Sequence, residues 1–225
     1  DKKAWLALVA GLVLTFGYAP FEIWPIVFIS LGAIIFCINP NSTGKAHAKT
    51  AAKYGFIFGL GWFGAGISWV HVSIATFGGM PLVASFSLMA LLCGYLALYP
   101  ALAFYLTTRF ATSTNSFGLL LISFFALSEY LRGVVLTGFP WLSFGYTQTD
   151  GPLNILAPYI GEFGLTLVCI AIGFALYRLT QKDIKTVQMP NIFMDTGLHL
   201  PSVHSTTVAI IQTPLNTSIS SINPR

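Results

Sequence analysis

The sequence predicts an all-α polytopic membrane protein, a bundle of about six transmembrane helices followed by a polar linker and the start of an incomplete second domain. Only 8% of the 225 residues are charged, against roughly 25% in a soluble domain. Hydrophobic residues make up 55% of the chain, and the mean hydropathy is +0.76. A soluble domain of this length could not remove that much apolar surface from water, because its surface area is too large for its volume.

Six apolar segments account for the predicted spans. The first follows two lysines, as a signal peptide would. However, residues 18–25 offer no small-residue cleavage site, and Tyr18, Phe21 and Trp24 with two prolines predict an interfacial turn. The first two spans are short, since a perpendicular helix needs about 20 residues to cross a bilayer core. The predicted spans are residues 4–19, 26–38, 54–74, 82–107, 117–136 and 153–179.

Glycines are concentrated in the third predicted span. Gly55 and Gly59 form a small-xxx-small pair, and Gly66 follows Gly59 after seven positions. This spacing lets helix backbones approach closely. We therefore expect these glycines to serve helix packing.

Residues 1–180 are predicted to form the bundle, and the character of the chain changes after them. Residues 181–205 are polar and contain Pro190 and Pro201, which is typical of a linker. Residues 206–212 are a β-branched apolar run typical of a strand, within a final segment 206–225 that begins a truncated domain.

The basic residues fall on alternate loops. The positive-inside rule therefore predicts a cytoplasmic amino terminus and an outward-facing loop at 138–152. Asp150 and Glu22 lie in the opposite set of loops. The basic set is Lys2, Lys3, Lys45, Lys49, Lys53, Arg109, Arg178, Lys182 and Lys185.

The most informative stretch is residues 128–161. It places Glu129 and Arg132 three positions apart in an apolar run, where they share a helix face and can pair. A loop rich in aromatics, glycine and proline follows. Such a loop can hold a lipid chain against its rings while Gln148 and Asp150 stay in water. The alternative, which composition alone favours, is an aromatic belt closing a helical hairpin. The candidate lipid or substrate contacts are Trp69, Phe139, Trp141, Phe144, Tyr146 and Gln148.

Neither a catalytic constellation nor a metal site follows from the residues alone. His47 and His71 fall at opposite ends of the third span, and Cys37, Cys93 and Cys169 lie in separate apolar runs. No pair has metal-ligand spacing, so we expect no metal and no cofactor. The small net charge of +4 reflects membrane orientation, and we expect no nucleic-acid partner.

Two long segments resemble a known family. Residues 64–81 and 128–161, above all Glu129 to Arg132 and Leu136 to Gln148, are similar to bacterial apolipoprotein N-acyltransferases, and so is the turn from Tyr18 to Pro25. The resemblance covers most of residues 1–180. It implies a multi-pass protein of the bacterial inner membrane, with loop 138–152 in the periplasm.

The resemblance also implies a reaction and its partners. The family transfers an acyl chain from a phospholipid donor to the N-terminal diacylglyceryl-cysteine of an apolipoprotein. A nitrilase-like αββα domain supplies a Glu base, a Lys that stabilises the oxyanion and a Cys nucleophile that forms a thioester. Here residues 207–212 resemble only the first strand of that domain, and one expected span before it is lacking. We therefore transfer no catalytic residue to this chain and expect it to be inactive alone.

Two other classes of function are open at this stage. One is a catalytically inactive remnant or a scaffold that binds lipid or lipoprotein, which fits the missing triad region. The other is a small transporter, which is less favoured because the sequence shows no inverted repeats or matched discontinuous helices.

Overall fold

The computed structural model describes residues 1–42 and 44–187, and this part of the chain is helical with no β-strand. Three short 3₁₀ helices lie in the loops, η2 (Val135–Thr137), η3 (Phe144–Gln148) and η4 (Pro152–Leu156), and a fourth, η1 (Thr15–Gly17), extends the first helix. The helices are α1 (Lys2–Leu14), α2 (Ile26–Ile38), α3 (Lys45–Gly66), α4 (Val70–Gly78), α5 (Leu82–Phe110), α6 (Thr114–Val134) and α7 (Ala157–Val187).

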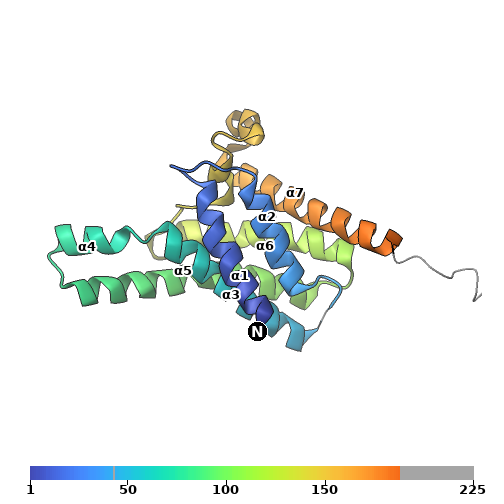
Figure 1. Ribbon diagram of the computed structural model, residues 1–225, viewed down its shortest axis with the longest axis horizontal. Coiled ribbons are helices and arrows are strands. Elements are labelled where there is room, and N and C mark those ends of the chain that lie inside the picture. Colours follow the sequence, from blue (N-terminus) through green and yellow to red (C-terminus); the bar gives the residue numbers. More distant parts are fainter. Residues whose placement is uncertain (43, 188–225) are drawn as a thin grey trace, which may run out of the picture. The chain divides into compact units, whose positions relative to one another are not determined.

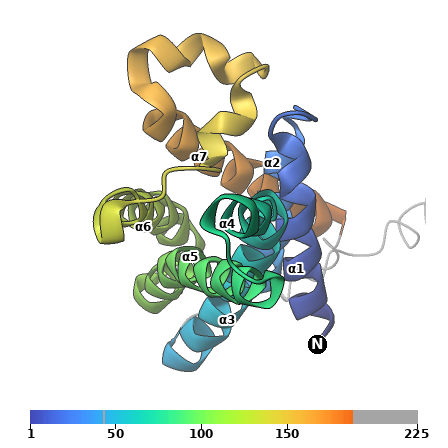
Figure 2. The ribbon, with the colours of Figure 1, turned by 90° about the vertical axis from the view of Figure 1, so that its left-hand side faces the viewer.

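Helix α3 is the centre of the bundle. It packs most extensively against α5 and next against α1, and α5 also packs against α6 (Figures 1 and 2). A Cβ atom at Gly59 would lie 2.8 Å from the Cα of Ala97, and one at Gly55 would lie 2.9 Å from the carbonyl oxygen of Pro100. Real Cβ atoms do not approach this closely, so the prediction that these two glycines serve helix packing is confirmed.

The predicted third span is not one continuous helix. Helix α3 ends at Gly66, and α4 begins at Val70 after a bend of 52°. Gly64 and Gly66 are weak helix formers, and the Leu142 side chain occupies the space beside Gly66. Helix α4 then runs beside the beginning of α5 (Figure 1).

The start of α3 is also earlier than predicted. Residues 45–53 were expected in a polar loop, but they form the first turns of the helix. Their alanines and lysines are strong helix formers, although they are not apolar enough to belong to a span.

The six predicted spans are only partly supported. Within residues 1–42 and 44–187, three helices are long and apolar enough to cross a membrane, or four if the bent α3 and α4 form one span. Helices α1 and α2 each have 13 residues. At about 1.5 Å per residue they are shorter than a hydrocarbon core of about 30 Å.

One end of the bundle carries the basic residues, and we call it the basic end. Lys3 Nζ donates to the carbonyl oxygen of Cys37 (3.3 Å), which places the start of α1 beside the end of α2. The hydroxyl of Tyr54 donates to Asp1 (3.1 Å), which places the start of α1 beside α3. Thr114 donates to Asn41 (2.8 Å), which adds the start of α6. The basic loops that alternate in the sequence therefore meet in space.

The opposite end carries the aromatic loop, and we call it the aromatic end. The Tyr18 hydroxyl donates to the carbonyl oxygen of Leu142 (2.7 Å), so the turn between α1 and α2 touches the loop after α6. The predicted strand 206–212 and most of the predicted linker lie outside the described residues. Helix α7 continues to Val187, so the first residues of that linker are helical.

Candidate functional site

The chain reverses direction directly after α6. Leu136, Thr137 and Gly138 have φ values of 51°, 72° and 80°, in the left-handed region that most residues avoid. A Cβ atom at position 138 would collide with the carbonyl oxygen of Gly133, so only glycine fits there. The N–H of Phe139 then donates to the carbonyl oxygen of Arg132 (2.8 Å). The loop is thereby folded back over the last turn of α6.

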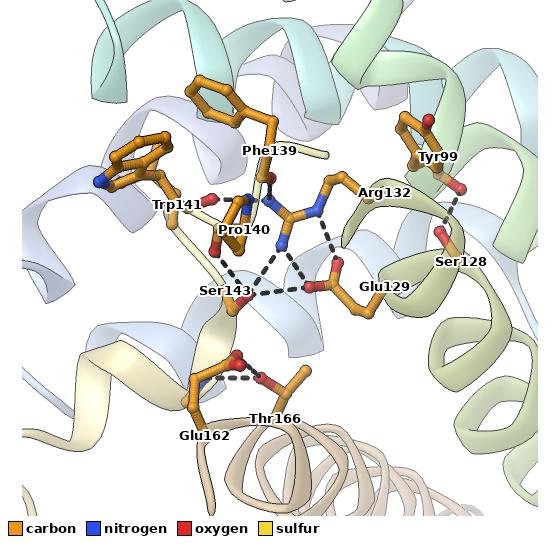
Figure 3. A network of polar contacts seen from close by, with 12 residues as sticks. Tyr99, Ser128, Glu129, Arg132, Phe139, Pro140, Trp141, Ser143, Glu162 and Thr166 are labelled. Carbon is orange, nitrogen blue, oxygen red and sulfur yellow. Dashed lines mark hydrogen bonds and ion pairs between the residues drawn. The ribbon is translucent and has the colours of Figure 1, made fainter. Parts of the chain in front are cut away.

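Arg132 holds this loop with every N–H group that it has (Figure 3). Its Nη1 donates to the carbonyl oxygens of Phe139 and Trp141, both at 2.6 Å. Its Nε donates to Glu129 (3.2 Å), and its Nη2 donates to Glu129 and to the Ser143 hydroxyl (2.8 Å). An arginine has five N–H donors, so the guanidinium has none left for another ligand.

The ion pair between Arg132 and Glu129 is buried. Arg132 is 1% exposed and Glu129 is 8% exposed, and the Ser143 hydroxyl lies within hydrogen-bond distance of both charged groups. The guanidinium also lies 5.7 Å from the ring centre of Phe63 on α3. Removing one member of a buried, hydrogen-bonded pair leaves the other charge unpaired, which is strongly destabilising. The pair therefore fixes the loop on the bundle.

Phe144 points into the bundle. It is fully buried, and its ring stacks on Trp62 of α3 with centroids 4.5 Å apart and planes 9° apart. Trp62 Nε1 donates to the Tyr18 hydroxyl (3.1 Å), which in turn donates to Leu142. The ring is closed off from the surface in this structure, and the predicted contact of Phe144 with lipid or substrate stays a prediction. Its ring belongs to the core, where it anchors the far side of the loop.

Gln148 is also buried, contrary to the expectation that it stays in water. Its side chain is 0% exposed, and its Nε2 donates to Thr147 (3.2 Å) and to the carbonyl oxygen of Trp24 (3.5 Å). Gln148 thus connects the loop to the turn between α1 and α2. Asp150 is exposed, as expected.

The other predicted contacts face outward. Trp141 is 59% exposed, Tyr146 is 45% exposed and Phe139 is half-buried, with the rings of Phe139 and Trp141 5.1 Å apart. Trp69 is 57% exposed but lies between α3 and α4, outside the loop. The structure thus presents Phe139, Trp141 and Tyr146 on one loop, and it places Trp69 on a different element.

Several residues of this site were missed by sequence reasoning. Ser143 joins the ion pair, and Thr166 of α7 accepts the N–H of Gly145 (2.9 Å) and donates to Glu162 (3.2 Å), as Figure 3 shows. Serine and threonine are common in membrane helices and loops. No periodicity or spacing distinguishes these two from the rest, so only their contacts identify them.

An acidic contact marks the outer side of the same end. A side-chain hydrogen bond with Asp150 raises the pKa of Glu22, and repulsion between the two carboxylates raises it further. The pair joins the loop that follows η3 to the turn between α1 and α2. The charge of this pair therefore depends on pH.

The described residues do not assemble a nucleophile or a metal site. Cys37, Cys93 and Cys169 are buried and lie in α2, α5 and α7. Within residues 1–42 and 44–187, no group of three or more histidine, cysteine or acidic residues could hold a metal ion.

The apolar helices and this site define a class, a helical membrane protein that holds an aromatic loop at one end of its bundle by a buried ion pair. Comparison with known proteins then identifies the family. Residues 10–175 match the model of the apolipoprotein N-acyltransferase N-terminal domain. The chain belongs to this family.

Similar proteins called apolipoprotein N-acyltransferase occur in several bacteria. The chain is 41% identical to the protein of Photobacterium profundum over 192 residues, which are 84% of this chain and 36% of that protein. It is 37% identical to the protein of Vibrio vulnificus over 222 residues, 94% of this chain and 43% of that one. The chain thus spans about two fifths of the length of these relatives.

Proposed function

We propose that this chain is the membrane part of an apolipoprotein N-acyltransferase, which transfers a fatty acyl chain from a phospholipid to the diacylated N-terminal cysteine of an apolipoprotein. Its place would be the bacterial inner membrane, with about six spans, the basic end in the cytoplasm and loop 138–152 in the periplasm. Family membership supports the activity. The gathering of the basic residues at one end supports the orientation.

The role of this part is to present an acyl chain of the phospholipid donor to the reacting groups. The observation that carries the proposal is the use of all five Arg132 donors inside the protein, four of them on Glu129 and the loop backbone. Arg132 is a positioning residue that braces the loop and does not bind a headgroup. The exposed rings of Phe139, Trp141 and Tyr146 then form a stable apolar surface for the chain.

The covalent step would take place on a cysteine that is not among these 225 residues. The thiolate attacks the ester carbonyl of the phospholipid, a thioester forms and the lysophospholipid leaves. The α-amino group of the apolipoprotein then attacks the thioester, an amide forms and the thiolate is released. This assignment is supported by the burial of Cys37, Cys93 and Cys169 within separate helices.

The test is Trp141→Ala in a full-length protein that carries this segment. We expect phospholipid-dependent acylation of a diacylated lipopeptide to fall about tenfold, because the acyl chain loses one large apolar contact. Trp5→Ala is the matched control, since Trp5 is 67% exposed at the basic end. Unchanged turnover in Trp141→Ala would remove the loop from the mechanism.

A second candidate function is a membrane scaffold that binds lipid or lipoprotein without catalysis. The separate burial of the three cysteines favours it for residues 1–225 taken alone. Acylation of the lipopeptide by purified residues 1–225 would exclude this candidate. Binding of the lipopeptide without acylation would support it.

A further inference from the structure

An open groove lies between α6 and α7 at the basic end, away from the aromatic loop. It has a volume of about 370 Å³ and is lined by Asn115, Phe174, Ala175, Arg178 and Leu179. Its position follows from the local packing. Gly118 leaves room for the Phe174 ring against α6, and Phe174 stacks on Phe117 with centroids 6.0 Å apart. Ala175, the next residue of α7, and Leu179, one turn beyond Ala175, continue the apolar wall.

One end of this groove is cationic. Arg178 Nη1 donates to the side-chain oxygen of Asn115 (2.8 Å), which holds the guanidinium at the start of α6. Among residues whose side chains the structure describes, no carboxylate pairs with Arg178. Among the described side chains, Arg178 uses one of its five N–H donors, and the others can bind a ligand. The Asn115 amide nitrogen adds a further donor.

The surroundings of the groove point to a lipid. Helix α7 is apolar enough to cross a membrane, so its outward side contacts acyl chains. The groove has an apolar wall and, near the end of the span, a guanidinium. A phospholipid has the two matching parts, an acyl chain and a phosphate. Arginine binds phosphate through paired N–H donors. Lys3 at the same end favours a ligand with net negative charge.

We propose that this groove binds one anionic phospholipid, with the phosphate on Arg178 and Asn115 and an acyl chain along Phe174, Ala175 and Leu179. The site is separate from the aromatic loop and lies at the opposite end of the bundle. The proposal rests on the geometry of the groove and is independent of the acyl transfer proposed above.

Native mass spectrometry of the purified chain in detergent micelles tests the headgroup half of the site. The probes are phosphatidylglycerol and phosphatidylcholine with identical acyl chains. We expect one phosphatidylglycerol to bind more tightly than phosphatidylcholine, because the choline cation offsets the negative charge of the phosphate. Arg178→Gln should weaken the binding of phosphatidylglycerol about tenfold. Arg109→Gln is the matched control, because Arg109 is an arginine at the same end that does not line the groove.

A second variant tests the apolar half. Ala175→Trp places a large side chain in the groove and leaves Arg178 intact. We therefore expect it to weaken the binding of phosphatidylglycerol as strongly as Arg178→Gln does. Glycerol phosphate, which has the anionic group without acyl chains, should not displace the lipid at equal concentration. Thermal unfolding of both variants should match that of the unsubstituted chain, because both positions lie on the outside of α7.

Three results would each overturn the proposal. The first is equal binding of the two lipids to the unsubstituted chain. The second is full phosphatidylglycerol binding by Arg178→Gln or by Ala175→Trp. The third is displacement of the lipid by glycerol phosphate, which would make the groove a site for a free anion.

Discussion

Arg132 and Arg178 are the same type of side chain at opposite ends of one bundle. Arg132 is 1% exposed and makes five hydrogen bonds to Glu129, Ser143 and two backbone carbonyls of the loop. Arg178 is half-buried beside an open groove and makes one, to Asn115. A buried guanidinium must use its donors inside the protein, because water is not available to satisfy them. At the edge of a span, the donors remain free for a ligand.

The two ends also differ in how much of their structure depends on single contacts. At the aromatic end the backbone adopts left-handed conformations at Leu136, Thr137 and Leu142, and long-range hydrogen bonds from Arg132 and Tyr18 hold it there. At the basic end Asn39 and Gly44 also have positive φ, but the contacts of Lys3, Thr114 and Arg178 are half-buried or exposed. Variants should therefore change stability more at the aromatic end, and binding of the anionic lipid more at the basic end.

The largest expected effect is that of Arg132→Met. It leaves Glu129 buried without a partner, which costs about 3–5 kcal/mol, and the carbonyl oxygens of Phe139 and Trp141 lose their donor, at about 1–3 kcal/mol each. Thermal unfolding in detergent micelles should show a large decrease in the midpoint. Arg178→Met should leave the midpoint nearly unchanged, and equal losses in the two variants would contradict the comparison.

Phe144→Ala should have the next largest effect. The substitution removes a buried ring that stacks on Trp62, and such a cavity costs about 3–5 kcal/mol. Tyr146→Ala, two positions away on the same loop and 45% exposed, should cost much less. The same unfolding measurement separates the two, and a larger loss in Tyr146→Ala would mean that the inward and outward sides of the loop are assigned the wrong way round.

Ser143→Ala should be milder than either. It removes an acceptor for Arg132 and a donor near Glu129, and hydrogen bonds to charged groups contribute about 1.5–3 kcal/mol. Ser123→Ala is the matched control, since that hydroxyl bonds only to its own helix, at the exposed side of α6. If both serine variants unfold at the same temperature, Ser143 is not part of the brace.

The smallest effect concerns Glu22 and Asp150. Because Asp150 raises the pKa of Glu22 in the folded state, the folded protein binds this proton more tightly than the unfolded chain does. This contribution to stability is therefore present below the ordinary pKa of Glu22, 4.5, and is lost as the pH rises through the raised value. Unfolding midpoints measured at a series of pH values should show this decrease, and Glu22→Gln should abolish it. An identical pH dependence in the variant would exclude the contact as its source.

Much of the fold could be predicted from composition and spacing. Long apolar runs predicted α5, α6 and α7, because a helix is the structure in which an isolated segment satisfies its own backbone in lipid. The spacing of Glu129 and Arg132 predicted that they can pair, and the spacing of Gly55 and Gly59 predicted a close helix contact. The start of α3 was missed because hydropathy detects apolar length and not the helix propensity of alanine and lysine.

The loop could not be predicted to the same depth. Its aromatic composition indicated a binding surface, but it has no helical or strand period that would say which rings face inward. Phe144 and Trp141 are equivalent in the sequence pattern, yet one stacks on Trp62 in the core and the other is 59% exposed. The difference arises from contacts with α3 and with the turn after α1, more than 70 residues away in the sequence.

The sequence by itself therefore determined the class of the protein, the positions of its long helices, the paired charges and the family resemblance, because these depend on local composition and on spacing along one helix. Only the tertiary structure decided that the third span is bent, that Arg132 is fully occupied, that Phe144 and Gln148 are buried, and that Arg178 borders an open groove. Each of these depends on which segments distant in the chain meet, and that is set by side-chain packing between helices rather than by the pattern within any one of them.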